Sequence, residues 1–309
     1  MDRFEDLQTF VRVVETGNIS RAAERMHIAK SAVSRRIADL EHRLGVQLFR
    51  RTTRQFNLTV SGQSFYERAV RILDDLDEAE QAVSQQHGTL SGILRVAVPL
   101  SFGLLHLGPA ITEFMQAHPQ VQFDLDFNDR QVDLVQEGID VAIRIAKLDD
   151  SSLIARRIST INSCVCASSA YLDKYGVPST PQDLQNHRCL VYSNLAEFDL
   201  WRYQTPDGHA NSVKVPVFLK SNNGDFLRAA AVAGQGIVLE PTFILFSAIA
   251  QGELVPLFTD YQWFKVNAYA IYPQTRHLSQ RVRDFVDFLV ERFSGSPYWD
   301  RCIDNLLKR

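Results

Sequence analysis

The sequence predicts an α/β protein that carries a separate, mostly helical head at its N-terminus. Within residues 3–86, apolar residues recur at helical spacing in four stretches, and one short alternating stretch lies between the third and the fourth. From residue 93 onward, apolar strands alternate with helices, which favours parallel strands flanked by helices. The largely polar residues 87–92, which include two glycines, separate the two patterns.

Length and composition indicate an ordinary globular chain. Its 309 residues suffice for two or three units with their own cores, and 45% hydrophobic with 22% charged residues is typical of soluble proteins. No stretch approaches the roughly 18 uncharged apolar residues that a membrane span needs. The first ten residues, MDRFEDLQTF, lack the pattern of a signal peptide. We therefore expect a cytoplasmic protein with no membrane partner.

The four cysteines are too few and too scattered for a disulfide framework. Cys164 and Cys166 lie two apart in an apolar run and would point the same way in a strand. A redox role for this pair stays open beside that of small buried residues. No spacing of His or Cys resembles a zinc site, so we expect neither a metal nor a cofactor. The other two cysteines are Cys189 and Cys302.

The head begins with a helix over residues 3–15, which Gly17 would close. A second helix, capped by Ser20, would end at Met26, and residues 27–29 would turn the chain into a third helix over residues 30–44. The apolar stripe of this third helix faces the core and consists of Val33, Ile37, Leu40 and Leu44.

The head is basic although the whole chain has a net charge of −3. Residues 21–54 hold nine Lys or Arg against three acids, a local surplus that indicates a polyanionic partner. The exposed start of the third helix would be a recognition helix that reads base edges. After Gly45, residues 46–59 would form a β-ribbon wing on the phosphates or in the minor groove. The candidate contacts to double-stranded DNA are Lys30, Ser31, Ser34, Arg35 and Arg36 in the helix and Arg50, Arg51 and Arg54 in the wing.

A long helix should run from Thr59 to about Gln86. Its apolar residues are spaced 4, 3, 4, 3 and 4 apart, as in a heptad seam. The small head offers this seam no evident partner, so we expect a homodimer through the helix, although packing against another domain of the same chain stays open. The seam consists of Phe65, Ala69, Ile72, Leu76, Ala79 and Val83.

The α/β part divides into two sets of elements. We expect strands at 93–99, 121–127 and 140–145 with helices at 102–117 and 132–137. From about residue 162, strands follow at 163–168, 189–193, about 213–219 and 236–241, with helices near Tyr171 and at 224–233. A last strand at 266–272 and a helix at 279–293 follow. Residues 294–309, with Trp299 and Ile303, look like a short amphipathic helix whose partner the sequence leaves open.

Ligands of open α/β sheets bind beyond the carboxyl ends of the strands. This rule selects Ser101, Phe102, Asn128 and Arg144 in the first set. The Ser101 hydroxyl and the N–H groups of a helix start could hold an anion. Arg144, flanked by apolar residues, needs either a ligand carboxylate or an internal partner such as Asp140, Asp129 or the second set of elements. In the second set the rule selects Phe198, Trp201 and Asn222, of which the two aromatic residues could equally be core.

No catalytic motif emerges from the sequence. There is no G-x-S-x-G elbow, no G-x-x-x-x-G-K-[ST] loop and no G-x-G-x-x-G after a strand. The run A-G-Q-G at 233–236 follows a helix and precedes a strand, which is the wrong order for phosphate binding. We therefore expect a binding protein and not an enzyme.

Three runs, S-R-A-A-E-R-M, A-V-S-R-R-I-A-D-L-E-H-R-L-G-V-Q-L-F-R-R and L-T-V-S-G, resemble the winged helix-turn-helix of LysR-type transcriptional regulators. The resemblance places Lys30, Ser31, Ser34 and Arg35 at the operator. Ala29, Lys30 and Ser31 stand where the family often has Ser, Gln and Pro, so the base preference should differ, and Ser31 could replace the missing cap.

The resemblance also implies a domain plan. Residues 1–58 would be the DNA-binding domain, 59–88 the dimerising linker helix and 89–309 an effector domain like a type II periplasmic binding protein. Lobe 1 would hold about 91–161 and 266–295, and lobe 2 about 162–265. A dimer of dimers is the family's usual assembly.

These observations predict a sequence-specific transcription regulator, modulated by a small-molecule effector in the cleft of its C-terminal domain. The effector would be an anion or carboxylate. Two alternatives stay open: a thiol-based redox sensor, and a ligand-binding module whose head binds nucleic acid nonspecifically or binds a partner protein.

Overall fold

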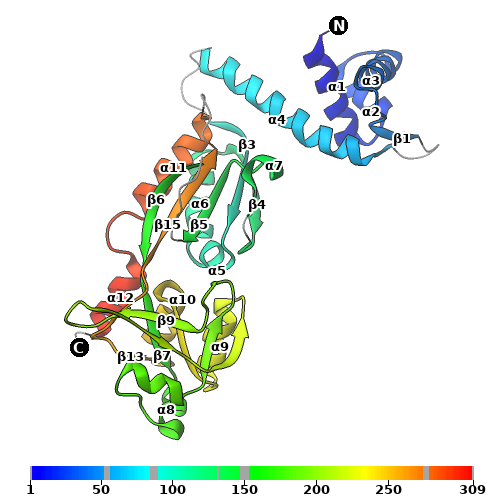
Figure 1. Ribbon diagram of the computed structural model, residues 1–309. Helices are drawn as coiled ribbons and strands as arrows, with labels where there is room; N and C mark the ends of the chain where they lie inside the picture. The colour runs from blue at the N-terminus through cyan, green and yellow to red at the C-terminus, as the bar shows by residue number, and fades with distance from the viewer. Residues whose placement is uncertain are drawn as a thin grey trace. The chain divides into compact units, whose positions relative to one another are not determined.

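The computed structural model describes residues 2–51, 56–83, 90–130, 132–146, 153–273 and 278–307. The chain forms two compact units, Met1–Ile93 and Leu94–Arg309 (Figure 1). Across the described ranges, no helix is both long and apolar enough to cross a membrane.

Unit 1 is a helical head with a two-stranded ribbon, as predicted. Its core is built by Phe10, Val33, Leu40, Leu48 and Phe49, all fully or almost fully buried. The elements are α1 (Arg3–Thr16), α2 (Ile19–Met26), α3 (Lys30–Leu44), β1 (Phe49–Arg51), β2 (Phe56–Leu58) and α4 (Val60–Val83).

The helix caps correct three expectations. Asn18, and not Ser20, caps α2, because its extended backbone lets Oδ1 accept from the N–H groups of Ser20 and Arg21 at 2.7 and 3.4 Å. Helix α3 starts at Ala29 without any side-chain cap, so Ser31 does not replace the missing hydroxyl. Leu44 is 39% exposed, which means that the buried stripe of α3 ends at Leu40.

The first half of the seam on α4 packs against its own head, which corrects the expectation that the head offers no partner. Phe65 lies 5.3 Å from Phe10 between ring centroids, and Ala69 is fully buried in the head core. Gly62 makes this approach possible, since a Cβ there would lie 2.0 Å from the carbonyl oxygen of Leu48. Ile72, further along the seam, is 45% exposed.

Unit 2 contains two five-stranded sheets, which define two lobes (Figure 1). The sheet of lobe 1 has the order β4-β3-β5-β15-β6, in which β3 and β5 run parallel and β15 runs antiparallel to β5 and β6. The sheets are therefore mixed and not parallel as expected. The strands are β3 (Ser91–Val98), β4 (Gln120–Phe127), β5 (Val141–Ala146), β6 (Leu153–Ile161) and β15 (Val266–Pro273).

Helices flank the sheet of lobe 1. The expected helix after β3 is continuous but includes one wider turn, at Gly103–Leu107. Helix α11 packs on α6 and on β6. The helices are α5 (Leu100–Phe102), α6 (Gly108–Ala117), α7 (Leu134–Glu137) and α11 (Gln280–Arg292).

Lobe 2 has the strand order β11-β8-β12-β7-β13. Strand β12 is parallel to β8 and antiparallel to β7. The strands are β7 (Ser163–Ala167), β8 (Cys189–Tyr192), β11 (Val217–Ser221), β12 (Ile237–Pro241) and β13 (Val255–Leu257), and the helices are α8 (Ser169–Tyr175), α9 (Gly224–Val232) and α10 (Thr242–Ala250), with a 3-10 turn at Pro181–Asn186.

A small antiparallel sheet beside lobe 2 corrects one predicted strand. The strand expected near 213–219 is two strands in different sheets, β10 (Ala210–Lys214) and β11. Pro216, which has no N–H for a ladder, stands between them. The other two strands of the small sheet are β9 (Leu200–Gln204) and β14 (Gln262–Trp263).

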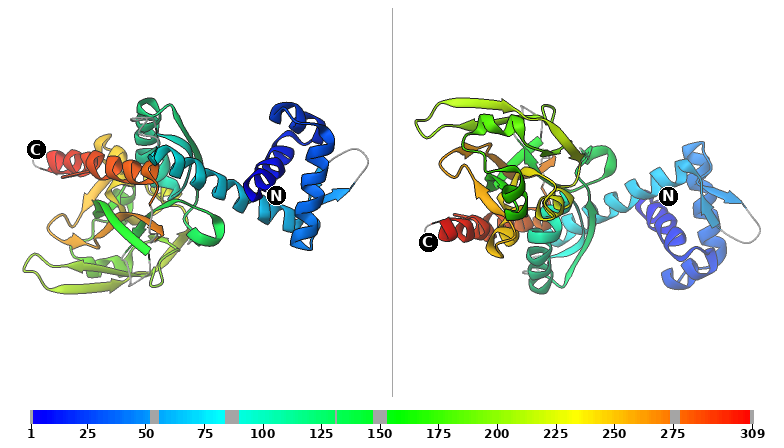
Figure 2. Two further views of the ribbon diagram at one scale, coloured as in Figure 1. Left: turned by 90° about the horizontal axis from the view of Figure 1, so that it is seen from above. Right: turned by 90° about the horizontal axis from the view of Figure 1, so that it is seen from below.

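The C-terminal helix α12 (Tyr298–Leu307) packs on α10, which gives the predicted amphipathic helix its partner. Trp299 is fully buried, and its ring lies 4.4 Å from His106 and 5.8 Å from Phe102. The Asp300 carboxylate accepts from Thr242 Oγ1 at 2.6 Å and Asn162 Nδ2 at 2.7 Å. Helices α11 and α12 follow one another along one side of unit 2 (Figure 2).

Candidate functional site

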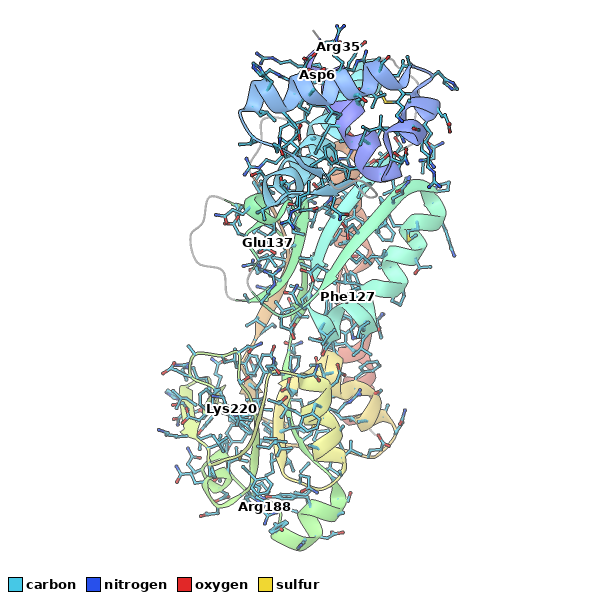
Figure 3. All side chains as sticks on the ribbon, turned by 90° about the vertical axis from the view of Figure 1, so that its right-hand side faces the viewer. Asp6, Arg35, Phe127, Glu137, Arg188 and Lys220 are labelled. Atoms are coloured by element: carbon cyan, nitrogen blue, oxygen red, sulfur yellow. The ribbon has the colours of Figure 1, made fainter. Side chains whose placement is uncertain are left out.

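The start of α3 presents one accessible polar face. Lys30, Ser31, Ser34 and Arg35 are all exposed, while Val33 on the opposite side is fully buried and holds the helix on the head. The Arg35 side chain is 79% exposed and extends from α3 into solvent (Figure 3). Its Nε lies 3.8 Å from Asp39 Oδ2, a distance typical of a weak surface ion pair that a phosphate or base can replace.

Arg36 belongs to the head's own framework and not to this face. Its Nη2 donates to Glu5 Oε2 at 2.5 Å and its Nη1 to Thr9 Oγ1 at 3.2 Å, and its side chain is only 25% exposed. Arg43 is bound to Asp6 in the same way, at 3.0 Å. These pairs join α3 to α1. Two of the nine basic residues counted in the sequence, Arg36 and Arg43, therefore form ion pairs within the head.

The wing is an antiparallel pair in which Arg50 faces Asn57 and is exposed. Arg51 lies in β1, its side chain is outside the described part, and Arg54 lies outside the described residues. Glu41, which the sequence did not single out, anchors the wing to α3. Its Oε1 accepts from the N–H groups of Leu48 at 2.7 Å and Phe49 at 3.1 Å.

In unit 2, Ser101 lies where the two lobes meet. Its Oγ donates to Asp225 Oδ2 in the first turn of α9 at 2.6 Å. The N–H of Leu100 at the start of α5 donates to Asp129 Oδ1 at 3.1 Å. The donors that were expected to hold an anion are thus bonded to carboxylates of the protein.

The aromatic candidates are core residues. Phe102 is fully buried against Phe243, 5.1 Å away between centroids, and against Trp299. Trp201 packs edge-on against Trp263 at 6.4 Å. Phe198 lies at the border of that core, with Lys220 Nζ 3.6 Å from its ring centroid.

Arg144 has an internal partner. Its Nη2 donates to the carbonyl oxygen of Val132 at 2.7 Å, and burial lowers its pKa. The two carboxylates named in the sequence analysis have other partners: Asp129 accepts from the N–H of Leu100, and Asp140 Oδ2 accepts from the N–H of Arg95 at 2.8 Å.

The two asparagine candidates differ. Asn128 follows β4, and its backbone N–H donates to Val98 O at 3.0 Å. Its Nδ2 is buried and has no hydrogen-bond partner among the described residues. Asn222 is exposed, and its neighbour Asn223 caps α9 by accepting from the N–H of Phe226 at 2.8 Å.

Two residues at the same strand ends escaped the sequence analysis. Glu240 is the penultimate residue of β12 and is 3% exposed, and burial, with Asp225 and Asp129 nearby, raises its pKa to about 8. Tyr192 ends β8, and burial raises its pKa to about 12, with the negative charge of Asp129 as a further cause. The signal was present: a carboxylate inside the apolar run GIVLEP meets the same criterion as Arg144.

Cys166 and Cys189 do not have the character of reactive thiols. Cys164 and Cys166 Sγ lie 3.5 Å apart, and burial raises the Cys166 pKa well above its usual value. Burial likewise raises the pKa of Cys189 to about 12. Because the thiolate is the reactive form, both shifts disfavour oxidation near neutral pH. The side chain of Cys302 is outside the described part.

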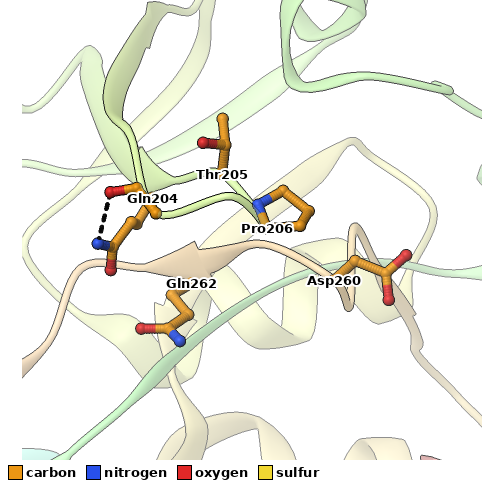
Figure 4. A pocket seen from close by; sticks show the side chains of 6 residues that line it. Gln204, Thr205, Pro206, Asp260 and Gln262 are labelled. Carbon is orange, nitrogen blue, oxygen red and sulfur yellow. Dashed lines mark hydrogen bonds between the residues drawn. The ribbon is translucent and has the colours of Figure 1, made fainter.

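A surface hollow of about 410 Å³ lies at the turn between β9 and β10 (Figure 4). Gln204 Nε2 donates to the Gly208 carbonyl at 2.8 Å and so is engaged within the turn. A second hollow of about 280 Å³ lies on the head between Arg3 and His42. Across the described ranges, no group of three His, Cys, Asp or Glu residues is placed to hold a metal ion. The first hollow is lined by Gln204, Thr205, Pro206, Gly208, Asp260 and Gln262.

A basic winged helix-turn-helix, followed by a two-lobed α/β unit, defines a DNA-binding regulator with a ligand-binding domain. Residues 4–63 match the "Bacterial regulatory helix-turn-helix protein, lysR family", and residues 87–294 match the "LysR substrate binding domain". The chain belongs to the LysR family of transcriptional regulators. It is a DNA-binding transcriptional regulator with a C-terminal effector-binding domain.

Relatives agree over nearly the whole chain. An uncharacterised HTH-type transcriptional regulator of Haemophilus influenzae is 36% identical over 91% of this chain and 98% of its own length. The HTH-type transcriptional regulator CrgA of Neisseria meningitidis serogroup C is 35% identical over 94% and 97%. A solved structure of CrgA from Neisseria meningitidis, described as a LysR-type transcriptional regulator, superposes with a TM-score of 0.61 at 34% identity, over 94% of this chain and 99% of that one.

Proposed function

We propose that the exposed face of α3, formed by Lys30, Ser31, Ser34 and Arg35, reads the operator and that Arg50 contacts its backbone. The observation that carries this proposal is the contrast between the two neighbouring arginines: Arg35 is 79% exposed with a weak ion pair to Asp39, and Arg36 is bound to α1. An N-terminal recognition-helix face with free donors suits base edges in the major groove.

The test is selection of DNA fragments from a random pool by the full-length protein. We expect enrichment of paired half-sites whose centres lie about one helical turn, or a multiple of it, apart. Recovery of unenriched DNA, with steep salt dependence and no sequence preference, would favour a nonspecific head instead.

We propose further that the regulator works as a homodimer through α4 and assembles into a dimer of dimers. Ile72 is exposed and Leu76 is half-buried beyond the part of α4 that the head covers. Side chains of Ala79 and Val83 are outside the described part, so the seam beyond Leu76 rests on its spacing. A second copy would bury this stripe and hold two heads on successive half-sites.

We propose that a small effector binds where the strand ends of the two lobes meet, around Ser101 and Asp225, and changes the affinity for the operator. The Ser101–Asp225 hydrogen bond supports this, because it links lobe 1 directly to α9 in lobe 2 and a ligand there would alter the relation of the lobes. The protein would act by binding alone, in the cytoplasm, where its DNA partner lies.

A further inference from the structure

Three carboxylates and a phenol lie at strand ends and at the start of α9 around the proposed effector site, and they come from both lobes. Asp129 follows β4 in lobe 1, and Asp225 lies in the first turn of α9. In lobe 2, Tyr192 ends β8 and Glu240 is the penultimate residue of β12. The negative charges of Asp225 and Asp129 both help to raise the pKa of the Glu240 carboxyl, and that of Asp129 also helps to raise the pKa of the Tyr192 hydroxyl. We call Asp129, Tyr192, Asp225 and Glu240 the acidic edge.

Glu240 provides an unsatisfied acceptor at this edge. It is almost fully buried, and its Oε1 has no hydrogen-bond partner among the described residues. Its other oxygen reaches the first turn of α9, since a Cβ on Gly224 would lie 3.0 Å from Oε2. A buried polar oxygen without a hydrogen-bond partner costs free energy, and an N–H group of a ligand could supply that partner.

The cations near the acidic edge do not neutralise it. Arg228 Nη2 lies 3.5 Å from Asp225 Oδ1, and its Nη1 donates to the Ile244 carbonyl at 3.3 Å. Arg144 is bound to the Val132 carbonyl. Among the residues that the structure describes, the edge therefore sets three carboxyl groups against one guanidinium that is already engaged.

The donors that would favour a carboxylate ligand are themselves occupied. The Ser101 hydroxyl donates to Asp225, and the Leu100 N–H donates to Asp129. A carboxylate placed there would face the carboxyl groups of Asp225 and Asp129, and like charges at close range disfavour binding. A metal cation fits no better, because the described residues offer no set of three ligands that could hold one.

We propose that the effector is a small organic ammonium compound whose N–H groups donate to Glu240 and Asp225. This inference rests on the proposed effector site between the lobes. A primary ammonium offers three donors and one positive charge, which matches the free oxygen of Glu240 and the carboxylates beside it. On binding, the ammonium replaces the Ser101 hydroxyl as the donor to Asp225, so that occupancy is coupled to the contact between the lobes.

The binding should depend on pH through Glu240. Its pKa of about 8 means that it is mostly protonated at neutral pH, whereas an ammonium ligand favours the ionised form. The titratable or charged groups around it are Asp129, Tyr192, Cys164 across the strand pair, Asp225, Arg228 and His106. Burial puts the pKa of Tyr192 at about 12 and that of His106 at about 4, so neither titrates between pH 6.5 and 8. Affinity should therefore rise by about tenfold per pH unit below the pKa of Glu240.

The experiment compares n-butylammonium chloride with sodium butyrate as probes, at matched ionic strength, by thermal shift and calorimetric titration of the full-length protein. The variants are Glu240→Gln and Asp225→Asn, which keep the shape of each side chain. Glu253→Gln, which removes an exposed carboxylate from the same lobe, is the matched control. We expect butylammonium to raise the melting temperature of the wild type and of the control. The two cleft variants, Glu240→Gln and Asp225→Asn, should each lose most of that shift. In Glu240→Gln the remaining shift should also no longer depend on pH.

Butyrate stabilising more than butylammonium, full retention of the shift in either cleft variant, or no shift with either ion would each overturn the inference. Operator affinity of the same proteins, measured without a probe, separates this from the proposed function. If both cleft variants bind the operator like the wild type, a failed ammonium response counts against the ligand class alone. If the wild type shows no operator preference, the proposed function fails whatever the probes do.

Discussion

Arg35 and Arg36 are adjacent in the sequence and have different tasks in the structure. Arg35 points into solvent from α3, whereas Arg36 is held by Glu5 and Thr9 of α1. Helical phase distinguishes them, because at about 100° per residue Arg36 lies beside the buried stripe of α3 and Arg35 lies on the opposite side. Glu5 of α1, 31 positions before Arg36 in the chain, is the acidic partner that holds Arg36 on the head.

Arg36→Ala should lower the stability of the head by about 1 kcal/mol, since it removes two hydrogen bonds, one of them charge-assisted and partly buried. Operator preference of the folded protein should be unchanged. Thermal unfolding measures the loss of stability, and titration with operator DNA measures the sequence preference. Arg12→Ala, which breaks an exposed 2.9 Å pair with Glu15 within α1, is the control and should change neither. A loss of preference in Arg36→Ala would show that Arg36 contacts bases.

Glu240 should make the stability of unit 2 fall as pH rises. Its folded pKa of about 8 lies above the ordinary value for Glu, so the folded protein keeps a proton that the unfolded chain releases. The stability is fully present below the unfolded pKa and is lost progressively up to about pH 8. Melting temperatures between pH 5 and 8.5 measure this, and Glu240→Gln should give a flatter curve. An unchanged slope in that variant would assign the titration to another group.

At the residue scale, the rule of strand ends worked in part. It placed Ser101 and Asn128 correctly beyond β3 and β4, and it missed Glu240 because the run GIVLEP was taken as a buried strand through its carboxylate. The strand-end rule also selected Phe102 and Trp201, but their side chains belong to the core. Their rings are buried against Trp299 and Trp263, which lie far along the chain and which local pattern does not reveal.

At the element scale, amphipathic helices were predictable and uniformly buried ones were not. Helix α3 begins and ends as predicted because one face is apolar and Gly45 ends it. Helix α10, TFILFSAIA, was missed because β12, α9 and α12 bury it on several sides, which leaves no polar face and hence no period. The long helix α4 is buried against the head at Ala69 and exposed at Ile72.

Ile72→Glu should dissociate the homodimer, because a charge would replace an apolar residue in the seam. Sedimentation or light scattering of the full chain should shift toward the monomer, with helix content unchanged. Gln63→Glu, on the opposite face of α4 and exposed, adds the same charge and should leave the assembly intact. A dimer that persists in Ile72→Glu would place the interface elsewhere on the chain.

In the whole molecule, the chain crosses between the two lobes more than once. It passes from β6 to β7 at Asn162 and returns between β14 and β15, after which α12 packs on α10 in lobe 2. Alternating elements predicted the layers, but the mixed strand directions of lobe 1 come from β15 inserting between β5 and β6. That insertion joins segments more than a hundred residues apart, which composition and periodicity cannot indicate.

The exposed polar face of α3 should read a specific DNA sequence. The most direct measurement is the affinity for the selected operator relative to random DNA of equal length, for the wild type and Arg35→Ala at one fixed salt concentration. We expect the variant to lose about 1–3 kcal/mol on the operator and far less on random DNA. An equal loss on both would reduce Arg35 to a phosphate contact and contradict the claim.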